Sequence, residues 1–279
     1  MTKVLFSGPS SLTRPATLGE DAAIEPHDPR PGVRAVVVPV DGSDESTRAI
    51  PLASMLAAVL DSELVVVSVV SDFRNEAAAL VDRLHDQLQE LPATVERRIV
   101  QSATVVRTLA EESAGGLVCI ATTAEPFDDE GFRHSVTDSL IAAATSPVIV
   151  LGPKCDDTVS IDRVVVAVDP SHDQEGLAYW STRLGYDMKV PVDFVHVTDS
   201  ETDTGEVRAE DSKVRTLVPG SGQSVAECLI ETADGALLAM GSHGRTGFRR
   251  LIQGSVGAAV IPHSGVPVLI LGPNVERHH

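Results

Sequence analysis

The sequence predicts an α/β fold made of two tandem domains, each an open five-stranded parallel sheet. Three observations support this prediction. Short apolar runs alternate with segments of helical periodicity, as expected for parallel strands that helices cover on both faces. The same order of segments occurs twice, which indicates an internal repeat. The chain has 279 residues, which suits two domains at roughly 150 residues each.

The first copy follows an N-terminal segment without sustained periodicity. Residues 1–32 contain five prolines between positions 9 and 31, and we expect a disordered arm there. Apolar runs and helical patterns then predict the elements of the first copy in chain order. Strands are expected near 35–40, 64–70, 95–100, 117–121 and 147–151, and helices near 50–60, 72–91, 104–113 and 136–144.

The second copy repeats the motifs of the first. VVVPVDGS returns as VVVAVDPS 128 residues later, whereas SPVIVLGP returns as VPVLILGP only 120 residues later. The missing residues fall in the polar segment between Asp199 and Lys213, so we expect the counterpart of the helix over 72–91 to be lost or shortened there. The predicted organisation is an arm over 1–32, domains over 33–153 and 161–273, a linker over 154–160 and a tail over 274–279.

Composition excludes several classes of function. The formal net charge of −18 opposes binding to nucleic acids and to acidic membranes, and an aromatic content of 3% leaves few rings for base stacking. The sequence has neither an apolar run near the ~18 residues of a membrane helix nor a secretory signal pattern, so we expect a cytoplasmic protein. The three cysteines lack the spacing of a zinc site, and Cys119 is expected to fill a buried strand position.

One candidate binding residue follows the first strand of the second copy. Ligands bind to open parallel sheets at the carboxyl ends of the strands. Asp169 lies at such an end, where its carboxylate can accept hydrogen bonds from a ribose or an adenine amino group. The alternative is that Asp169 only stabilises the turn, while Ser171 caps the next helix and Gln174 completes a Ser-x-x-Gln box.

A more specific pattern follows the predicted strand at 237–240. Gly241 and Gly244 precede nine residues and then Gly254-Ser255, where a helix is expected to begin. The glycines let the backbone approach a ligand, and the free N–H groups of a helix N-terminus favour anions such as phosphate. The pattern differs from the GxxxxGK[ST] phosphate loop because no lysine follows the last glycine. His243 is expected to be an ordinary loop residue, and His196 a hydrogen-bonded core residue.

With this motif and the upstream aspartate, residues 33–273 resemble the universal stress protein family in its tandem form. The resemblance implies the Rossmann-like fold of the adenine nucleotide alpha hydrolases and a site for ATP, with Mg²⁺ as the accompanying ion. Ala167, Asp169 and Val197 would frame the adenosine, with the backbone of Val197 facing the base. The ribose and phosphates would be lined by Met240, Gly241, Gly244, Gly254, Ser255 and Val256. Arg245, in the same loop, is a further candidate phosphate contact, with a solvated basic loop as the alternative.

The first copy lacks most of these residues. The three motif glycines are replaced, and three arginines of the motif loop become carboxylates. The residues at these positions are Ala121, Ala124, Glu125, Asp129, Glu130 and His134, with only the serine retained, as Ser135. Two unit charges 4 Å apart interact by about 1 kcal/mol in water and by more where solvent is partly excluded. We therefore expect only the second domain to bind ATP.

The leading hypothesis is a regulatory stress-response protein with a nucleotide-binding second domain and a degenerate first domain. Two alternatives remain: a slow ATPase or phosphotransferase, for which the sequence places no general base, and an interaction module that binds cyclic AMP or no nucleotide. The resemblance also implies that the terminal strands of the two copies, 147–151 and 266–271, pair to form an internal pseudo-dimer. The sequence leaves open whether whole chains dimerise further.

Overall fold

The computed structural model describes residues 33–71, 95–123, 135–156, 160–169, 174–198, 208–209, 212–241 and 255–275. The predicted N-terminal arm, the predicted helix over 72–91 and most of the glycine motif loop lie outside the described residues.

The described part of the first half confirms the predicted order of strands and helices, with the helix over 72–91 left untested. Its elements are β1 (Ala35–Pro39), α1 (Asp44–Thr47), α2 (Ala49–Val59), β2 (Glu63–Val70), β3 (Glu96–Gln101), α4 (Val105–Glu112), β4 (Leu117–Ala121), α5 (Val136–Ala143) and β5 (Val148–Leu151). The five strands lie within one residue of the predicted ranges. One feature was not predicted: the short helix α1, which begins because the Ser43 side chain accepts a hydrogen bond from the Ser46 backbone N–H.

The described elements of the second half repeat this order, except that none corresponds to α1 and two short strands lie between the second and third strands of its sheet. Its elements are β6 (Arg163–Ala167), α6 (Glu175–Met188), β7 (Val192–Val197), β8 (Arg208–Ala209), β9 (Ser212–Lys213), β10 (Arg215–Leu217), α7 (Val225–Thr232), β11 (Ala236–Gly241), α8 (Ser255–Val260) and β12 (Val268–Leu271). Between β7 and β10, the described residues form the two-stranded antiparallel ladder of β8 and β9. The rest of the polar segment, residues 199–207 and 210–211, lies outside the described residues, so the predicted loss or shortening of a helix stays a prediction.

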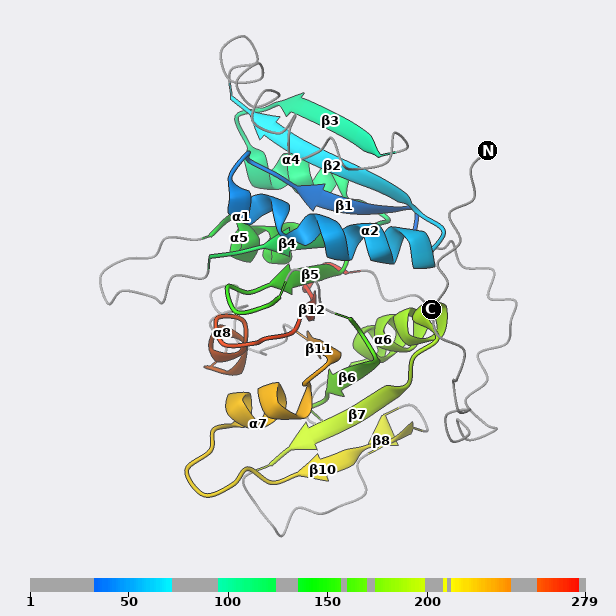
Figure 1. Cartoon of the computed structure of the whole chain (residues 1–279), viewed down its shortest axis with the longest axis vertical. Helices are drawn as coiled ribbons and strands as arrows, with labels where there is room; N and C mark the ends of the chain where they lie inside the picture. The colour runs from blue at the N-terminus through cyan, green and yellow to red at the C-terminus, as the bar shows by residue number, and fades with distance from the viewer. Residues whose placement is uncertain are drawn as a thin grey trace. The chain divides into compact units, whose positions relative to one another are not determined.

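All strands except β8 and β9 form one ten-stranded sheet (Figure 1). The strand order is β10-β7-β6-β11-β12-β5-β4-β1-β2-β3. Within each half the strands are parallel, and the first strand of the half lies between its second and fourth strands. In each half the first strand is therefore central. The next two strands of the sheet extend it on one side, and the last two extend it on the other side. The predicted α/β class is confirmed.

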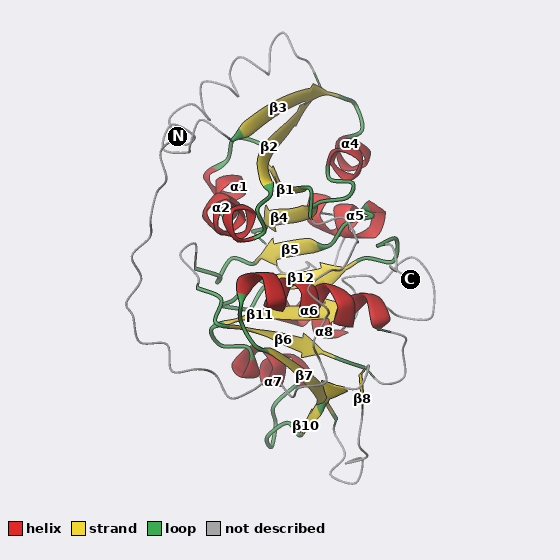
Figure 2. Ribbon diagram, turned by 90° about the vertical axis from the view of Figure 1, so that its right-hand side faces the viewer, coloured by secondary structure: helices red, strands yellow, loops and turns green. Residues whose placement is uncertain are grey.

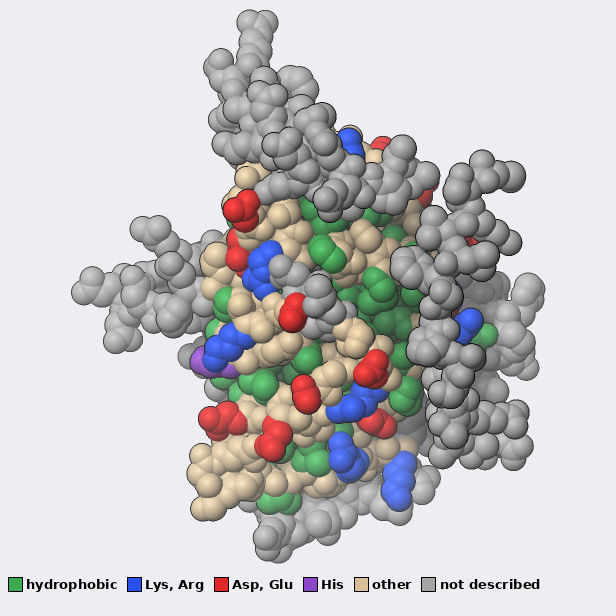
Figure 3. All heavy atoms as spheres, in the orientation of Figure 1, with side chains coloured by type: hydrophobic (Ala, Val, Ile, Leu, Met, Phe, Trp, Pro, Cys, Tyr) green, Lys and Arg blue, Asp and Glu red, His purple; other side chains and the backbone are tan. Residues whose placement is uncertain are grey.

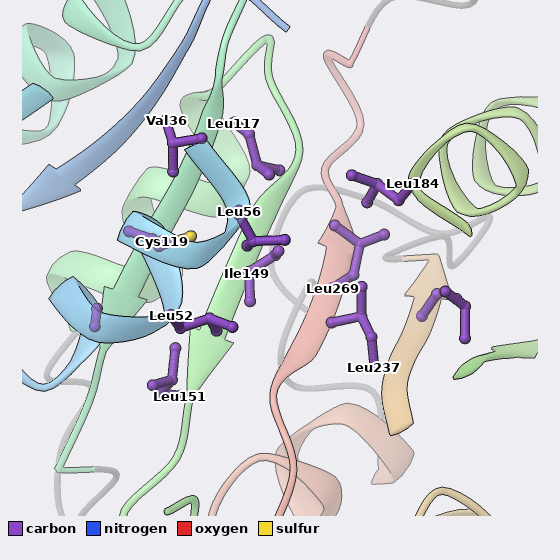
Figure 4. Packing of buried hydrophobic residues seen from close by; sticks show 14 of the residues in the cluster. Val36, Leu52, Leu56, Leu117, Cys119, Ile149, Leu151, Leu184, Leu237 and Leu269 are labelled. Atoms are coloured by element: carbon purple, nitrogen blue, oxygen red, sulfur yellow. The ribbon is translucent and has the colours of Figure 1, made fainter. Parts of the chain in front are cut away.

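The two halves join through their last strands. β12 pairs antiparallel with β5, and Leu269 lies opposite Ile149. Both side chains are fully buried, and they belong to one core cluster that contains residues of both halves, such as Leu56 and Leu237. Figure 4 shows these side chains on either side of the β5–β12 seam. The predicted pairing of the terminal strands is confirmed.

Successive residues of each strand supply opposite faces of the sheet, because side chains alternate along a strand. Val36 and Val38 of β1 pack in the core cluster beneath α2 and α6, whereas Val37 packs in the cluster beneath α4, α5, α7 and α8. In Figure 2, α2 lies on one side of the first-half strands and α4 and α5 lie on the other. Near-continuous apolar strands are thus explained by helices on both faces.

The surface charges, the burial of Cys119 and the lengths of the helices can be compared with the expectations from composition. On the face in Figure 3, the described acidic and basic side chains are interspersed with hydrophobic ones. Cys119 in β4 is fully buried, as predicted, and burial raises the pKa of its thiol far above the ordinary value. Among the described residues, every helix is too short or too polar to cross a bilayer.

Candidate functional site

Several of the predicted site residues of the second half lie together at the carboxyl edge of its sheet. β6 lies between β7 and β11, and this is where the order of the strands reverses, the place where ligands bind to open α/β sheets. Ala167, the last residue of β6, pairs with Met240 of β11 on one side and with Val195 of β7 on the other. Asp169 and Val197 each follow this row by two residues. Four predicted site residues therefore converge from three neighbouring strands.

The apolar members of the site share one face of the sheet. Ala167, Val197, Met240 and Val256 are all partly buried and pack against the core cluster beneath α7 and α8. Partial burial leaves each of them with surface for a ligand. The described edge thus provides an apolar wall suited to a flat, weakly polar group such as a nucleobase.

The polar members begin at the same edge. Asp169 is exposed just after β6, and Gly241 is the last residue of β11. α8 starts at Ser255, where the sequence predicted a helix. Gly244, Arg245 and Gly254 lie outside the described residues. Because α8 has only six residues, its macrodipole is small, and phosphate binding would depend mainly on the loop's glycines and arginines.

One detail of the Asp169 turn differs from the sequence interpretation. In the predicted Ser-x-x-Gln box, Gln174 would occupy the first turn of the helix after a Ser171 cap. The structure has Gln174 itself as the N-cap residue of α6, with no hydrogen bond from its side chain to the helix N-terminus. The reason is that α6 begins only at Glu175, later than the pattern suggested. This box is therefore wrong.

Asp41 is the first-half counterpart of Asp169, and its carboxylate stabilises a turn. The Asp41 carboxylate accepts hydrogen bonds from the Ser43 backbone N–H, at 2.9 Å, and from the Ser43 hydroxyl, at 2.6 Å. Its own backbone N–H donates to the Ser46 hydroxyl at 3.2 Å. Partial burial raises the pKa of Asp41, but the Ser43 and Ser46 hydrogen bonds outweigh it and leave the pKa below the ordinary value. Asp41 therefore serves the turn that leads into α1.

The serine that both halves share also has a structural explanation. The Ser135 hydroxyl accepts a hydrogen bond from the Asp138 backbone N–H at 3.0 Å and caps α5. A cap of this type is worth about 1 kcal/mol. Retention of this serine in the first half therefore follows from helix stability and does not require a ligand there.

His196 has a role at this edge that the sequence did not reveal. Its Nδ1 lies 3.1 Å from the carbonyl oxygen of Val168, the residue that precedes Asp169. The prediction of a hydrogen-bonded core histidine is thus confirmed in its hydrogen bond, but the side chain is only partly buried. It lies one residue before Val197. Its position beside two predicted adenosine contacts follows from the pairing of β6 and β7, which no single segment of sequence shows.

A groove lies elsewhere in the described structure. The groove, of about 660 Å³, runs along α4 and reaches the end of α5, lined by residues such as Val106, Ala110 and Ala143. It belongs to the helical face of the first half and includes none of the predicted site residues. Within the described ranges, no group of three or more His, Cys, Asp or Glu side chains could hold a metal ion.

Comparisons with known proteins agree with this fold. The profile of the Universal stress protein family matches residues 32–152 and 207–272. The chain is similar to the solved structure of a universal stress protein from Archaeoglobus fulgidus DSM 4304, with 17% identity, a TM-score of 0.62, and coverage of 85% of this chain and 96% of that chain. It is also similar to a protein of unknown function from Pseudomonas aeruginosa PAO1, with 18% identity, a TM-score of 0.58, and coverage of 87% and 93%.

At these identities the structural likenesses show the fold alone, and none of the curated proteins matches the sequence. The family assignment rests on the profile, which covers the first half of the ten-stranded sheet, the part of the second half from β10 to β12, and more than half of the chain. The chain belongs to the universal stress protein family.

Proposed function

We propose that the second half, residues 161–273, binds one adenine nucleotide, ATP with Mg²⁺, and that the chain is a cytoplasmic regulatory protein of the stress response. The observation that carries this proposal is a contrast between two halves of the same fold. In the sequence that follows β11, the second half has Gly241, Gly244 and Gly254, and the first half has other residues at all three equivalent positions.

The described part of the edge fits the adenosine portion of the nucleotide. The partly buried side chains of Ala167, Val197 and Met240 can contact the base, and the exposed carboxylate of Asp169 can accept hydrogen bonds from ribose hydroxyls. A carboxylate beside a ribose is the arrangement by which many dinucleotide-binding folds hold that sugar. The site therefore offers an apolar surface and one acceptor, which matches the polarity of adenosine.

The triphosphate would lie toward the glycine motif. Gly244 and Gly254 leave the backbone open to phosphate oxygens, and Arg245 carries a positive charge that its first-half counterpart, Glu125, reverses. Mg²⁺ would come with the triphosphate and neutralise part of its charge. The residues that we assign bind and orient the ligand, and binding alone is sufficient for a regulatory role.

Titration calorimetry with ATP tests the proposal, and the repeat provides matched controls. Asp169→Ala should weaken binding by about 10- to 150-fold, which is the loss of a hydrogen bond to a charged group expressed as affinity. Asp41→Ala, at the equivalent position of the first half, should leave the affinity unchanged. In the same way, Gly244→Glu should abolish binding, and Ala124→Glu should not.

The stoichiometry decides which half binds. One ATP per chain, lost in the second-half variants alone, would support the proposal. Two equal sites, or a single site that Asp41→Ala removes, would refute it. Phosphate release under single-turnover conditions would instead favour the ATPase alternative, and tighter binding of cyclic AMP than of ATP would favour the interaction module.

A further inference from the structure

The side chain of His196 connects two neighbouring strand ends. Its Nδ1 lies 3.1 Å from the Val168 carbonyl oxygen. A carbonyl oxygen can only accept, so Nδ1 carries the proton and donates it to this bond. In the neutral ring the other nitrogen, Nε2, is then the acceptor.

This hydrogen bond lies where the backbone ladder between β6 and β7 ends. The Val168 backbone N–H donates to the Val195 carbonyl at 2.8 Å, and the imidazole holds the Val168 carbonyl on the same residue. Both polar groups of the Val168 backbone are therefore fixed to β7. The peptide that leads into Asp169 consequently has a defined orientation.

The two residues next to this contact are the predicted adenosine contacts. Asp169 follows Val168 along the chain, and Val197 follows His196. On its other edge, β7 pairs with β10, and there the Thr198 backbone N–H donates to the Leu217 carbonyl oxygen at 3.0 Å. The imidazole hydrogen bond therefore joins the two residues that directly precede Asp169 and Val197.

The first half provides a comparison at the same position. There the backbone bond is conserved, because the Val40 N–H donates to the Val67 carbonyl at 2.8 Å. The position of His196 is occupied by Ser68, which is buried. The structure shows no hydrogen bond between these two described residues, Ser68 and Val40. The half that lacks the glycine motif therefore also lacks the imidazole bridge.

We propose that His196 is a positioning residue for the nucleotide site, acting through Val168 to hold Asp169 and Val197 at the separation that adenosine requires. This proposal rests on the proposed function of the second half. The imidazole itself need not touch the ligand. Its contribution is to keep Val168 and Asp169 in their binding geometry before the nucleotide arrives, which lowers the entropy lost on binding.

Two substitutions at His196 separate positioning from simple packing. His196→Leu fills a similar volume but donates no hydrogen bond, whereas His196→Asn restores an N–H donor near the place of Nδ1. We expect His196→Leu to weaken ATP and free adenosine by the same factor, about 3- to 10-fold, since the affected contacts are to the adenosine. His196→Asn should recover most of the affinity.

A double-mutant cycle measures the coupling between His196 and Asp169 in ligand affinity, which a purely structural role of His196 would not produce. If His196 acts through Asp169, then His196→Leu should cost little further affinity in an Asp169→Ala background. Each variant is titrated at a temperature where circular dichroism shows it folded. Ser68→Ala is the matched first-half control and should leave the affinity at the wild-type value.

The outcomes distinguish the two proposals. If the wild-type chain binds neither ATP nor adenosine, the proposed function fails and the positioning role fails with it. If the wild-type chain binds but folded His196→Leu binds equally well, only the positioning role is refuted. Additive losses in the double variant, or no recovery in His196→Asn, would also overturn it.

Discussion

Replacing Ile149 in β5 by alanine should destabilise the second half of the chain together with the first. Ile149 is fully buried, and its register partner across the seam is Leu269 of β12, which is fully buried as well. Both belong to a core cluster that continues across the seam. The substitution therefore removes contacts from both halves at once.

The expected magnitude follows from the size of the cavity that the substitution leaves. Replacing a fully buried isoleucine by alanine costs about 2–5 kcal/mol, out of a total stability of about 5–15 kcal/mol for an ordinary protein. At roughly 2–4 °C per kcal/mol for a chain of this size, the midpoint should fall by about 4–20 °C.

The single tryptophan makes the assay specific to one half. Trp180 lies in α6 of the second half, so its fluorescence follows that half, while far-UV circular dichroism follows both. We expect the two signals to coincide in wild type and to shift together in Ile149→Ala. Val59→Ala is the control, because Val59 is 40% exposed on α2 and should change stability by at most about 0.5 kcal/mol. If the Trp180 midpoint stayed at its wild-type value in Ile149→Ala, the two halves would unfold independently and the reasoning would be wrong.

Two further predictions concern the first half. Because the folded-state pKa of Asp41 lies below its ordinary value of 3.8, its ionised form stabilises the fold above about pH 4, and this contribution is lost as the pH falls through the lower folded pKa. Asp41→Asn should therefore lower stability at pH 7 but not near pH 2, as denaturant titrations at the two pH values would show; an equal loss at both would contradict this. The guanidinium of Arg48 donates to the carbonyl oxygens of Gly152 and Cys155 after β5, so Arg48→Met should cost about 1–3 kcal/mol by thermal unfolding, and an unchanged midpoint would contradict it.

The sequence could predict the strands because their environment is nearly uniform. β4 is covered on both faces and reads as a continuous apolar run, so its bounds coincide with those of the run. The repeat then located the second half without any knowledge of contacts. By contrast, β8 and β9 have two residues each and no periodicity, and a ladder this short depends on its surroundings.

Side-chain partners at the site could not be predicted in the same way. Asp41 and Asp169 occupy equivalent places in the two copies, yet only the structure shows that the Asp41 carboxylate is held by Ser43. The contact between His196 and Val168 joins residues that are 28 positions apart, and it arises from the register of two strands. The start of α6 was missed as well: the helix begins at Glu175, with no capping hydrogen bond from the Gln174 side chain, later than the Ser-x-x-Gln pattern suggested.

The antiparallel pairing of β5 with β12 determines which margin of the sheet carries the strand ends of each half. Because the strands that each half contributes to the ten-stranded sheet all run the same way, an antiparallel junction turns the carboxyl ends of the two halves toward opposite margins of that sheet. The strand ends of the first half, such as Ala121, cannot supply a side chain to the margin that holds Asp169. Duplication with this junction therefore gives the chain two margins that face away from each other. One can keep its ligand chemistry while the other diverges, and any signal between them must pass through the ten strands that they share.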